Sequence, residues 1–313
     1  MVLWVKFCHG HRKMERVGLA TSGGIGSLLI DIARSQGFFE DRGIQLVVHE
    51  TSLSSDALDQ LSSTGVELAV SSEAPIVKKT FAGEKIKILA TLYSTSSDIK
   101  IVARKDHGIR SAEDLRGKRV GETGASAPEY YLASFLLQFG LRLEDVSVVH
   151  KKSSELLGDL KHGKIDAVAL GEPQAYRLKD GLGSKGIVLP DGALYHDSFN
   201  LVARDGWLTS HSKTAVHFLE ALHLAENYEI DHPGEVAALV SAQAGAQGVE
   251  RQRLEGSSSL RLDESLIVSL EERSRWMIEH REVSLLTKMP NFLELIYLPA
   301  LKSVKPDGIG VIH

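Results

Sequence analysis

Three glutamates stand where a binding protein or an enzyme would place its chemistry. Glu73, Glu122 and Glu172 each follow a short apolar run typical of a buried strand and precede a segment with helical periodicity. A carboxylate beside free backbone amides suits a zwitterion or an amine-bearing ligand better than a bare inorganic anion. Solvated loop carboxylates are the plainer interpretation. Of the three, only Glu172, in Gly-Glu-Pro, is predicted to contact a ligand.

A turn of small residues, Thr21-Ser-Gly-Gly-Ile-Gly, follows a predicted strand and precedes a predicted helix. This context, with Glu50 at the end of the next strand, is that of a dinucleotide-binding fingerprint. The fingerprint requires a small residue where Leu29 stands. The turn is therefore interpreted as a ligand-binding loop, and no cofactor is predicted.

The second candidate loop, Glu122-Thr-Gly-Ala-Ser-Ala-Pro-Glu129, has the form of an anion-receiving turn. Ser126 can cap the helix that follows, and Glu129 can complete a capping box. Capping alone would explain these residues. The two interpretations are compatible, because amides at a helix start can also serve a ligand.

Metal and nucleophile chemistry have weaker candidates. Cys8-His9-Gly10-His11 has soft-metal ligands, but it lies in a basic tail where adventitious binding is the expected explanation, so no metal site is predicted. The single cysteine excludes an intramolecular disulfide and a Cys-based zinc cage. Without a recognisable nucleophile–base pair, no catalytic residue is predicted.

Composition limits the function classes. The chain has 313 residues, of which 43% are hydrophobic and 25% are charged. This length and composition suit two medium-sized globular domains. A net charge of −5 argues against a nucleic-acid binder, which needs a basic face. No apolar run approaches the roughly 20 residues that span a bilayer.

The N-terminal segment bears on location. Basic residues follow its short apolar start at once, so it lacks the apolar core of a signal peptide, and the residues before Cys8 do not form a lipobox. As written the chain is expected to be cytoplasmic. Met14 is an alternative start to Met1, because the first strand follows it directly.

Strands and helices alternate along the chain. Apolar runs such as Arg16–Ala20 and Ile44–Val48 are separated by segments of helical spacing, a pattern that predicts mainly parallel sheets. Ile101-Val-Ala-Arg-Lys-Asp is echoed by Leu201-Val-Ala-Arg-Asp, which predicts two similar strands around a self-contained block. The predicted domains are an N-terminal tail, 1–15; a discontinuous first lobe, 16–104 plus 199–313; and a second lobe, 105–198.

Four segments together carry a family resemblance: LLIDIARSQGFFEDRGIQLVV, IVARKDHGIRSAEDLRGKRVGETG, GLRLEDVSVV and LKHGKIDAVALGEP. In this order the chain resembles substrate-binding proteins of nitrate/sulfonate/taurine-type ABC transporters, a superfamily that includes thiamine-pyrimidine-precursor proteins. The resemblance implies an α/β, two-lobed, hinged fold of the periplasmic binding protein type 2. Each lobe would be a mainly parallel sheet flanked by helices.

The predicted function is capture of a small organic anion or zwitterion by hinge closure, for an ABC permease and ATPase on other chains. A monomer that binds no nucleic acid is expected. Ligands of open parallel sheets sit at the carboxyl ends of the strands. The predicted contacts on these loops, with one residue near the hinge, are Ser22, Gly23, Ser72, Ser96, Thr123, Ser126, Glu172 and Asn200.

Two alternatives remain open. The first is a cytosolic enzyme on the same scaffold, either desulfinase-like or related to pyrimidine-precursor synthesis. Superfamily relatives that resemble a sulfinate desulfinase use a cysteine in the turn after the first strand, where this chain has Thr21, Ser22 and Gly23. The cysteine-rich stretch of the fungal pyrimidine-synthesising relatives is also not found. The other alternative is a cytosolic ligand sensor that signals through a partner.

Overall fold

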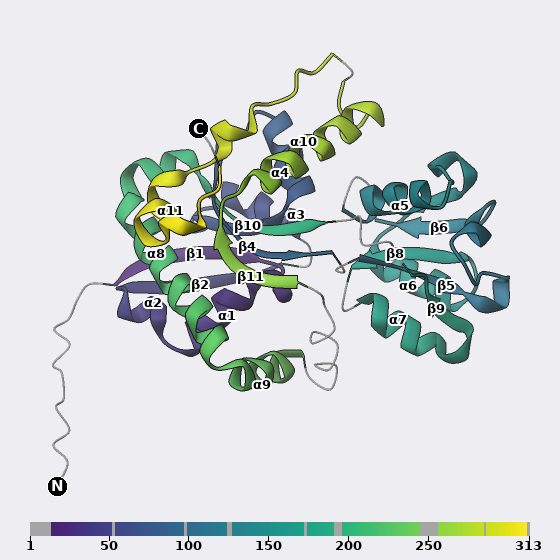
Figure 1. Ribbon diagram of the computed structural model, residues 1–313, viewed down its shortest axis with the longest axis horizontal. Helices are drawn as coiled ribbons and strands as arrows, with labels where there is room; N and C mark the ends of the chain where they lie inside the picture. The colour runs from purple at the N-terminus through teal and green to yellow at the C-terminus, as the bar shows by residue number, and fades with distance from the viewer. Residues whose placement is uncertain are drawn as a thin grey trace, which may run out of the picture.

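The computed structural model describes residues 14–51, 54–96, 99–123, 127–171, 174–190, 196–244, 256–284 and 286–311. Two β-sheets form the centres of two lobes, which lie side by side along the long axis (Figure 1). The first lobe contains both the beginning and the end of the described chain, whereas the second is built from one continuous internal segment.

The first lobe is organised on a six-stranded sheet of order β11-β4-β10-β3-β1-β2. β1, β2, β3 and β4 run in one direction, and β10 and β11 run against them. The strands are β1 (Glu15–Thr21), β2 (Ile44–Glu50), β3 (Leu68–Ser72), β4 (Ile86–Thr95), β10 (Asp197–Arg204) and β11 (Gly256–Arg261).

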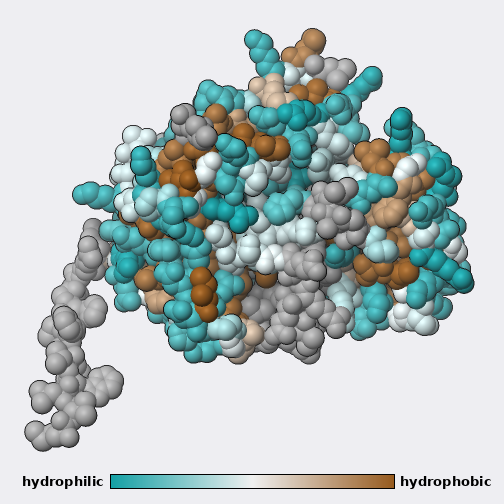
Figure 2. All heavy atoms as spheres, viewed as in Figure 1, coloured by the Kyte–Doolittle hydropathy of each residue, from teal (hydrophilic) through white to brown (hydrophobic). Residues whose placement is uncertain are grey.

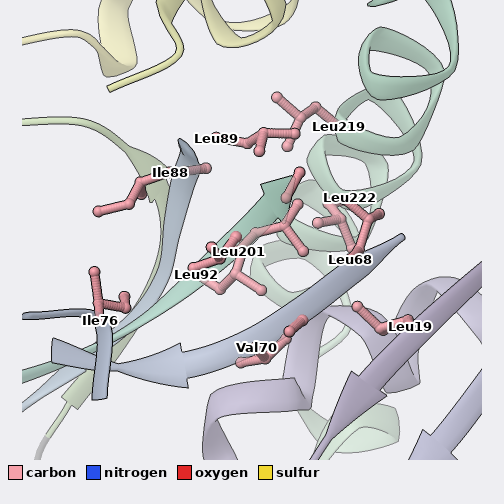
Figure 3. Packing of buried hydrophobic residues seen from close by; sticks show 14 of the residues in the cluster. Leu19, Leu68, Val70, Ile76, Ile88, Leu89, Leu92, Leu201, Leu219 and Leu222 are labelled. Carbon is pink, nitrogen blue, oxygen red and sulfur yellow. The ribbon is translucent and has the colours of Figure 1, made fainter. Parts of the chain in front are cut away.

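Helices cover both faces of this sheet. α8 packs against α1, α2 and α11, whereas α4 packs against α3 and α10. Leu219 and Leu222 of α8 join Leu68 and Leu201 of the central strands in one buried cluster (Figure 3). The helices are α1 (Leu28–Ser35), α2 (Phe38–Asp41), α3 (Ser54–Asp59), α4 (Glu73–Phe81), α8 (Asp205–Asp231), α9 (Pro233–Ala244), α10 (Glu264–Glu279) and α11 (Leu298–Val304).

The second lobe has a five-stranded sheet of order β7-β6-β8-β5-β9. α5 packs on one face with Leu132, Phe135 and Leu136, and the residues of α6 and α7 form a separate cluster with Val102 and Val168. The elements are β5 (Ile99–Arg104), β6 (Arg119–Glu122), α5 (Ala127–Gln138), β7 (Ser147–His150), α6 (Ser153–Lys161), β8 (Ala167–Gly171), α7 (Gln174–Leu182) and β9 (Gly186–Val188).

The strand pairing corrects two expectations. Both sheets are mixed, because β10 returns antiparallel between β3 and β4, and β5 pairs antiparallel with β8 and β9. The pairing of β5 also assigns it to the second sheet, although 16–104 was predicted as first lobe. The echoed strands β5 and β10 thus belong to different sheets, and the first crossing lies between β4 and β5.

The described surface is that of a globular protein. Figure 2 shows hydrophilic side chains over most of the viewed face, with apolar ones in small separate patches. Among the described helices, none combines the length and the hydropathy needed to cross a bilayer.

Candidate functional site

The carboxyl ends of strands from both sheets are directed toward the boundary between the lobes (Figure 1). We define rim 1 as the carboxyl ends of β1, β3 and β4 with the amino end of β10. The register supports this grouping, because Phe199 pairs with Ser72 and Asp197 pairs with Thr95. We define rim 2 as the carboxyl ends of β6, β7 and β8. Ile99, where the chain enters the second sheet, pairs with Gly171 at this same end.

The turn after β1 is the first part of rim 1. Thr21 and Ser27 share a hydroxyl–hydroxyl hydrogen bond, and the Gly23 amide donates to Thr21 Oγ1 over 3.0 Å. Gly23 has a φ of 66°, a conformation that favours glycine. A Cβ on Gly26 would lie 2.5 Å from the Phe199 ring, so only glycine allows this close approach to β10. The small residues therefore shape the turn, as the sequence suggested.

Serine hydroxyls line the end of β3. Ser72 occupies the N-cap position of α4, and its Oγ lies 3.1 Å from Ser54 Oγ. Ser71 Oγ donates to the Ser54 carbonyl over 3.1 Å. These contacts tie the start of α3 to the end of β3, next to the predicted contact Ser72.

A buried charge network lies behind rim 1. Arg273 of α10 donates from Nε to Glu73 Oε2 over 2.6 Å, and its Nη2 lies 3.3 Å from Asp197 Oδ1. Ser198 and Ser269 each donate a hydroxyl to Glu73 over 2.6 Å. Glu73 is 1% exposed, so its interpretation as a solvated loop carboxylate is wrong. It is a structural ion-pair partner.

Sequence reasoning missed Arg273. A sequence feature could have identified it, because Leu266, Leu270 and Met277 mark the buried face of α10 at helical spacing. Arg273 stands on that face and is 1% exposed. A charged residue on an apolar stripe needs a buried partner of opposite charge, which here lies 200 positions away.

Asn200 lies within β10 and is completely buried. Thr91 donates its hydroxyl to Asn200 Oδ1 over 2.7 Å. Asn200 Nδ2 donates to the Ser198 carbonyl over 3.1 Å and to its hydroxyl over 2.9 Å. These bonds connect the central strands β4 and β10, so Asn200 stabilises the return crossing. Its predicted contact with a ligand stays a prediction.

Rim 2 carries two carboxylates and a histidine. Glu122 is fully buried at the end of β6 and forms an ion pair with His150 at the end of β7. Its interpretation as a solvated loop carboxylate is therefore also wrong. One ligand atom from each of Glu122, Glu129 and His150 lies within 4.8 Å of the others, close enough for a divalent cation. The ion pair accounts for the approach of Glu122 and His150, and no metal is assigned to the group.

The two lobes touch through α5 and α10. The Tyr130 ring of α5 packs edge-to-face against Trp276, with ring centroids 5.7 Å apart. The Arg273 guanidinium carbon lies 4.5 Å from the centroid of the same ring. Burial raises the pKa of Tyr130. Burial, and then the negative charge of Glu129, raise the pKa of Glu282 to about 7. The contact thus joins the charge network of rim 1 to the first helix of rim 2.

The predicted contacts fall on both rims. Ser22 and Gly23 lie in the turn after β1, Ser72 ends β3, and Ser96 follows β4 directly. Thr123 follows β6 on rim 2. Ser126 and Glu172 lie outside the described residues. Loop positions were thus located by the strand–helix alternation, although whether each residue contacts a ligand stays a prediction.

Comparison with known proteins identifies relatives of three kinds. A provisionally named thiamine biosynthesis protein of Haemophilus influenzae is 28% identical over 211 residues, covering 66% of each chain, just under two thirds of the relative. The aliphatic sulphonate binding protein SsuA of Escherichia coli superposes with a TM-score of 0.76 and 17% identity over 92% of each chain. The desulfurization enzyme DszB superposes with a TM-score of 0.67 and 17% identity, covering 93% of this chain and 99% of DszB.

At such identities the structural matches establish the fold, and they confirm the predicted two-lobed periplasmic-binding-protein architecture. The matched structures include both binding proteins and an enzyme, because one fold can carry both activities. The sequence match is more specific. The family model described as NMT1/THI5 like matches residues 28–236, two thirds of the chain. The chain belongs to the NMT1/THI5-like family.

Proposed function

We propose that this chain is the solute-binding component of an ABC importer and holds a small organic anion or zwitterion between rim 1 and rim 2. The observation that supports this most directly is the strand topology. Carboxyl ends of strands from two separate sheets face the same boundary, and the chain crosses that boundary between β4 and β5 and between β9 and β10. Ligands of open α/β sheets bind at such ends.

Closure of the lobes would supply the mechanism. Bending at the two crossings would bring the rims together around a bound solute and shift the equilibrium toward the closed form. Rim 1 would offer the hydroxyls of Ser22 and Ser72 and the amides of the turn after β1. Rim 2 would offer Thr123. The membrane permease and the ATPase would be separate chains.

The charges of the rims support a ligand of mixed character. Small hydroxyl residues and turn amides at rim 1 suit an anionic group. Glu129, which is partly exposed next to rim 2, suits a cationic or amine group better than a second anion. The E. coli neighbour is a sulphonate-binding protein by its title, and the H. influenzae relative is named for thiamine biosynthesis. Zwitterionic sulfonates and aminopyrimidines are therefore the first compounds to test.

The proposal is tested by a thermal-shift screen of taurine, alkanesulfonates, nitrate, bicarbonate and aminopyrimidines, followed by calorimetric titration of each compound that stabilises the protein. A ligand at a hundred times its Kd adds about 2.7 kcal/mol to the unfolding free energy. We expect Thr123→Trp to abolish this binding because the indole would fill the space next to rim 2. Ser184→Trp, at an exposed position of the second lobe, should bind as the native protein does.

Two results would contradict the proposal. Undiminished affinity in Thr123→Trp would place the ligand elsewhere. Conversion of the bound compound, detected by mass spectrometry after incubation, would favour an enzyme such as the desulfurization neighbour. Recovery of the unchanged compound from the native protein supports capture.

A further inference from the structure

A pocket of about 640 Å³ lies at the end of the first sheet that is remote from both rims. Its walls include Ile86, the first residue of β4, and Arg204, the last residue of β10, which pair with each other. At the opposite end of the same two strands, Thr95 pairs with Asp197 at rim 1. β4 has 10 residues, so about 30 Å separates the pocket from the rims at 3.3 Å per residue.

We propose that this pocket is a second binding site, for a small planar aromatic carboxylate or sulfonate. Its volume falls in the range of about 300–1,000 Å³ that is usual for small-molecule sites. Such sites combine apolar and aromatic walls with a few charged groups that fix orientation. This pocket has both, with two basic residues and one acidic residue in its wall.

The aromatic wall comes from a break in α8. Trp207 and His211 stack face to face, with ring centroids 5.1 Å apart and an angle of 5° between the rings. The backbone of His211 is not helical, with φ −125° and ψ 31°, and marks a kink in α8. Both rings line the pocket, together with the buried side chains of Leu61 and Ile86. A flat ring can pack against this wall.

The charge comes from Arg204 and Lys85. Both line the pocket, and neither side chain forms an ion pair within the described part of the chain. The acidic residue of the pocket wall, Glu84, is bound to Lys79 over 2.7 Å. Lys79 also pairs with Asp59 over 2.7 Å. Arg204 and Lys85 are therefore the charged groups of the pocket wall that have no ion-pair partner among the described residues. A guanidinium matches a carboxylate or sulfonate in a two-pronged hydrogen-bonded pair, so the pocket favours an aromatic acid over an aromatic amine.

The test uses benzoate and benzenesulfonate, with benzamide as the uncharged control. We expect saturable binding of both acids by calorimetric titration, with benzamide at least about tenfold weaker because it lacks the charge that pairs with Arg204. Binding next to the indole should also change the fluorescence of Trp207. The Trp207→Leu variant should lose this change.

Variants separate this pocket from the rims. Arg204→Gln should weaken benzoate binding by at least about tenfold. The matched control, Arg177→Gln, changes an exposed arginine of the second lobe and should bind as the native protein does. Thr123→Trp, which changes rim 2, should also leave benzoate binding intact. Unfolding curves of each variant would show that the fold is kept.

Three outcomes would overturn the proposal. The first is no saturable binding of either acid up to about 10 mM, about ten times the Kd of a weak millimolar ligand. The second is binding that is unchanged in both Arg204→Gln and Trp207→Leu. The third is binding that is lost in Thr123→Trp but kept in Arg204→Gln, which would assign the acids to the rims.

Discussion

Rim 1 and rim 2 each have a buried glutamate where a strand ends, Glu73 directly after β3 and Glu122 as the last residue of β6, but the two charges are neutralised differently. At rim 1, Glu73 and Arg273 form a 2.6 Å ion pair in which the side chains are 1% and 2% exposed. At rim 2, Glu122 is just as buried, but its partner His150 has a side chain that is 57% exposed. A histidine is charged only when protonated, whereas an arginine is always charged.

The difference assigns separate tasks to the two rims. The charges of rim 1 are satisfied within the first lobe, by Arg273 and by the hydroxyls of Ser198 and Ser269. Changes there should act mainly on stability. At rim 2 a charge acts across the boundary, because burial, and then the negative charge of Glu129, raise the pKa of Glu282 to about 7. Changes there should act mainly on closure, on ligand binding and on the response to pH.

The largest effect is expected from Arg273→Met. Removing one partner of a buried ion pair leaves an uncompensated charge, which costs about 3–5 kcal/mol of unfolding free energy. Urea denaturation would measure the loss. The matched control is Arg275→Met, because Arg275 makes an exposed pair with Glu271 over 2.7 Å. Such surface pairs contribute about 0–1 kcal/mol. Equal losses in the two variants would remove the distinction between rim 1 and an ordinary surface.

Tyr130→Leu tests the contact that joins the rims. The substitution removes the edge-to-face pair with Trp276 and the ring under Arg273, together about 1–2 kcal/mol. Because this contact connects the lobes, we expect the ligand-free protein to become more open, with a larger radius of gyration in X-ray scattering. Tyr130→Phe keeps the ring and should keep the native radius. A native radius in Tyr130→Leu would show that this contact does not hold the lobes together.

A smaller, pH-dependent effect is expected from Glu282→Gln. The folded-state pKa of about 7 lies above the usual value of 4.5, so the folded protein holds a proton that the unfolded chain releases. Native stability should therefore fall as pH rises from 4.5 to 7. The variant has no proton to lose, so it should melt above the native protein at pH 8 and close to it at pH 5. Equal differences at both pH values would contradict the raised pKa.

Local patterns predicted the loops of this protein well. Ser22 and Thr123 each follow a strand at a rim and Ser72 ends one, as the alternation of apolar runs and helical segments indicated. The two-lobed fold followed from the resemblance and is confirmed. The loop positions depend on residues that are close in the sequence. The fold resemblance depends on several sequence segments that occur in a fixed order.

The same local patterns could not predict which strands or side chains pair when they lie far apart in the sequence. β5 and β10 both end in Val-Ala-Arg, yet β5 pairs in the second sheet and β10 in the first. Their partners are set by the topology and not by this shared segment. β11 has the sequence GSSSLR, which carries no strand pattern, and it forms through its pairing with β4. The ion pair of Glu73 with Arg273 joins residues that are 200 positions apart.

The position of β10 between β3 and β4 has a consequence for biosynthesis. During synthesis β1 to β4 emerge first, but β3 and β4 lack the strand that separates them until residues 197–204 have been made. The whole second lobe is translated in the interval, as one continuous segment whose sheet is complete with β9. The later part of the chain thus completes the fold of the earlier part, and the N-terminal strands expose unpaired edges to chaperones and proteases until β10 inserts.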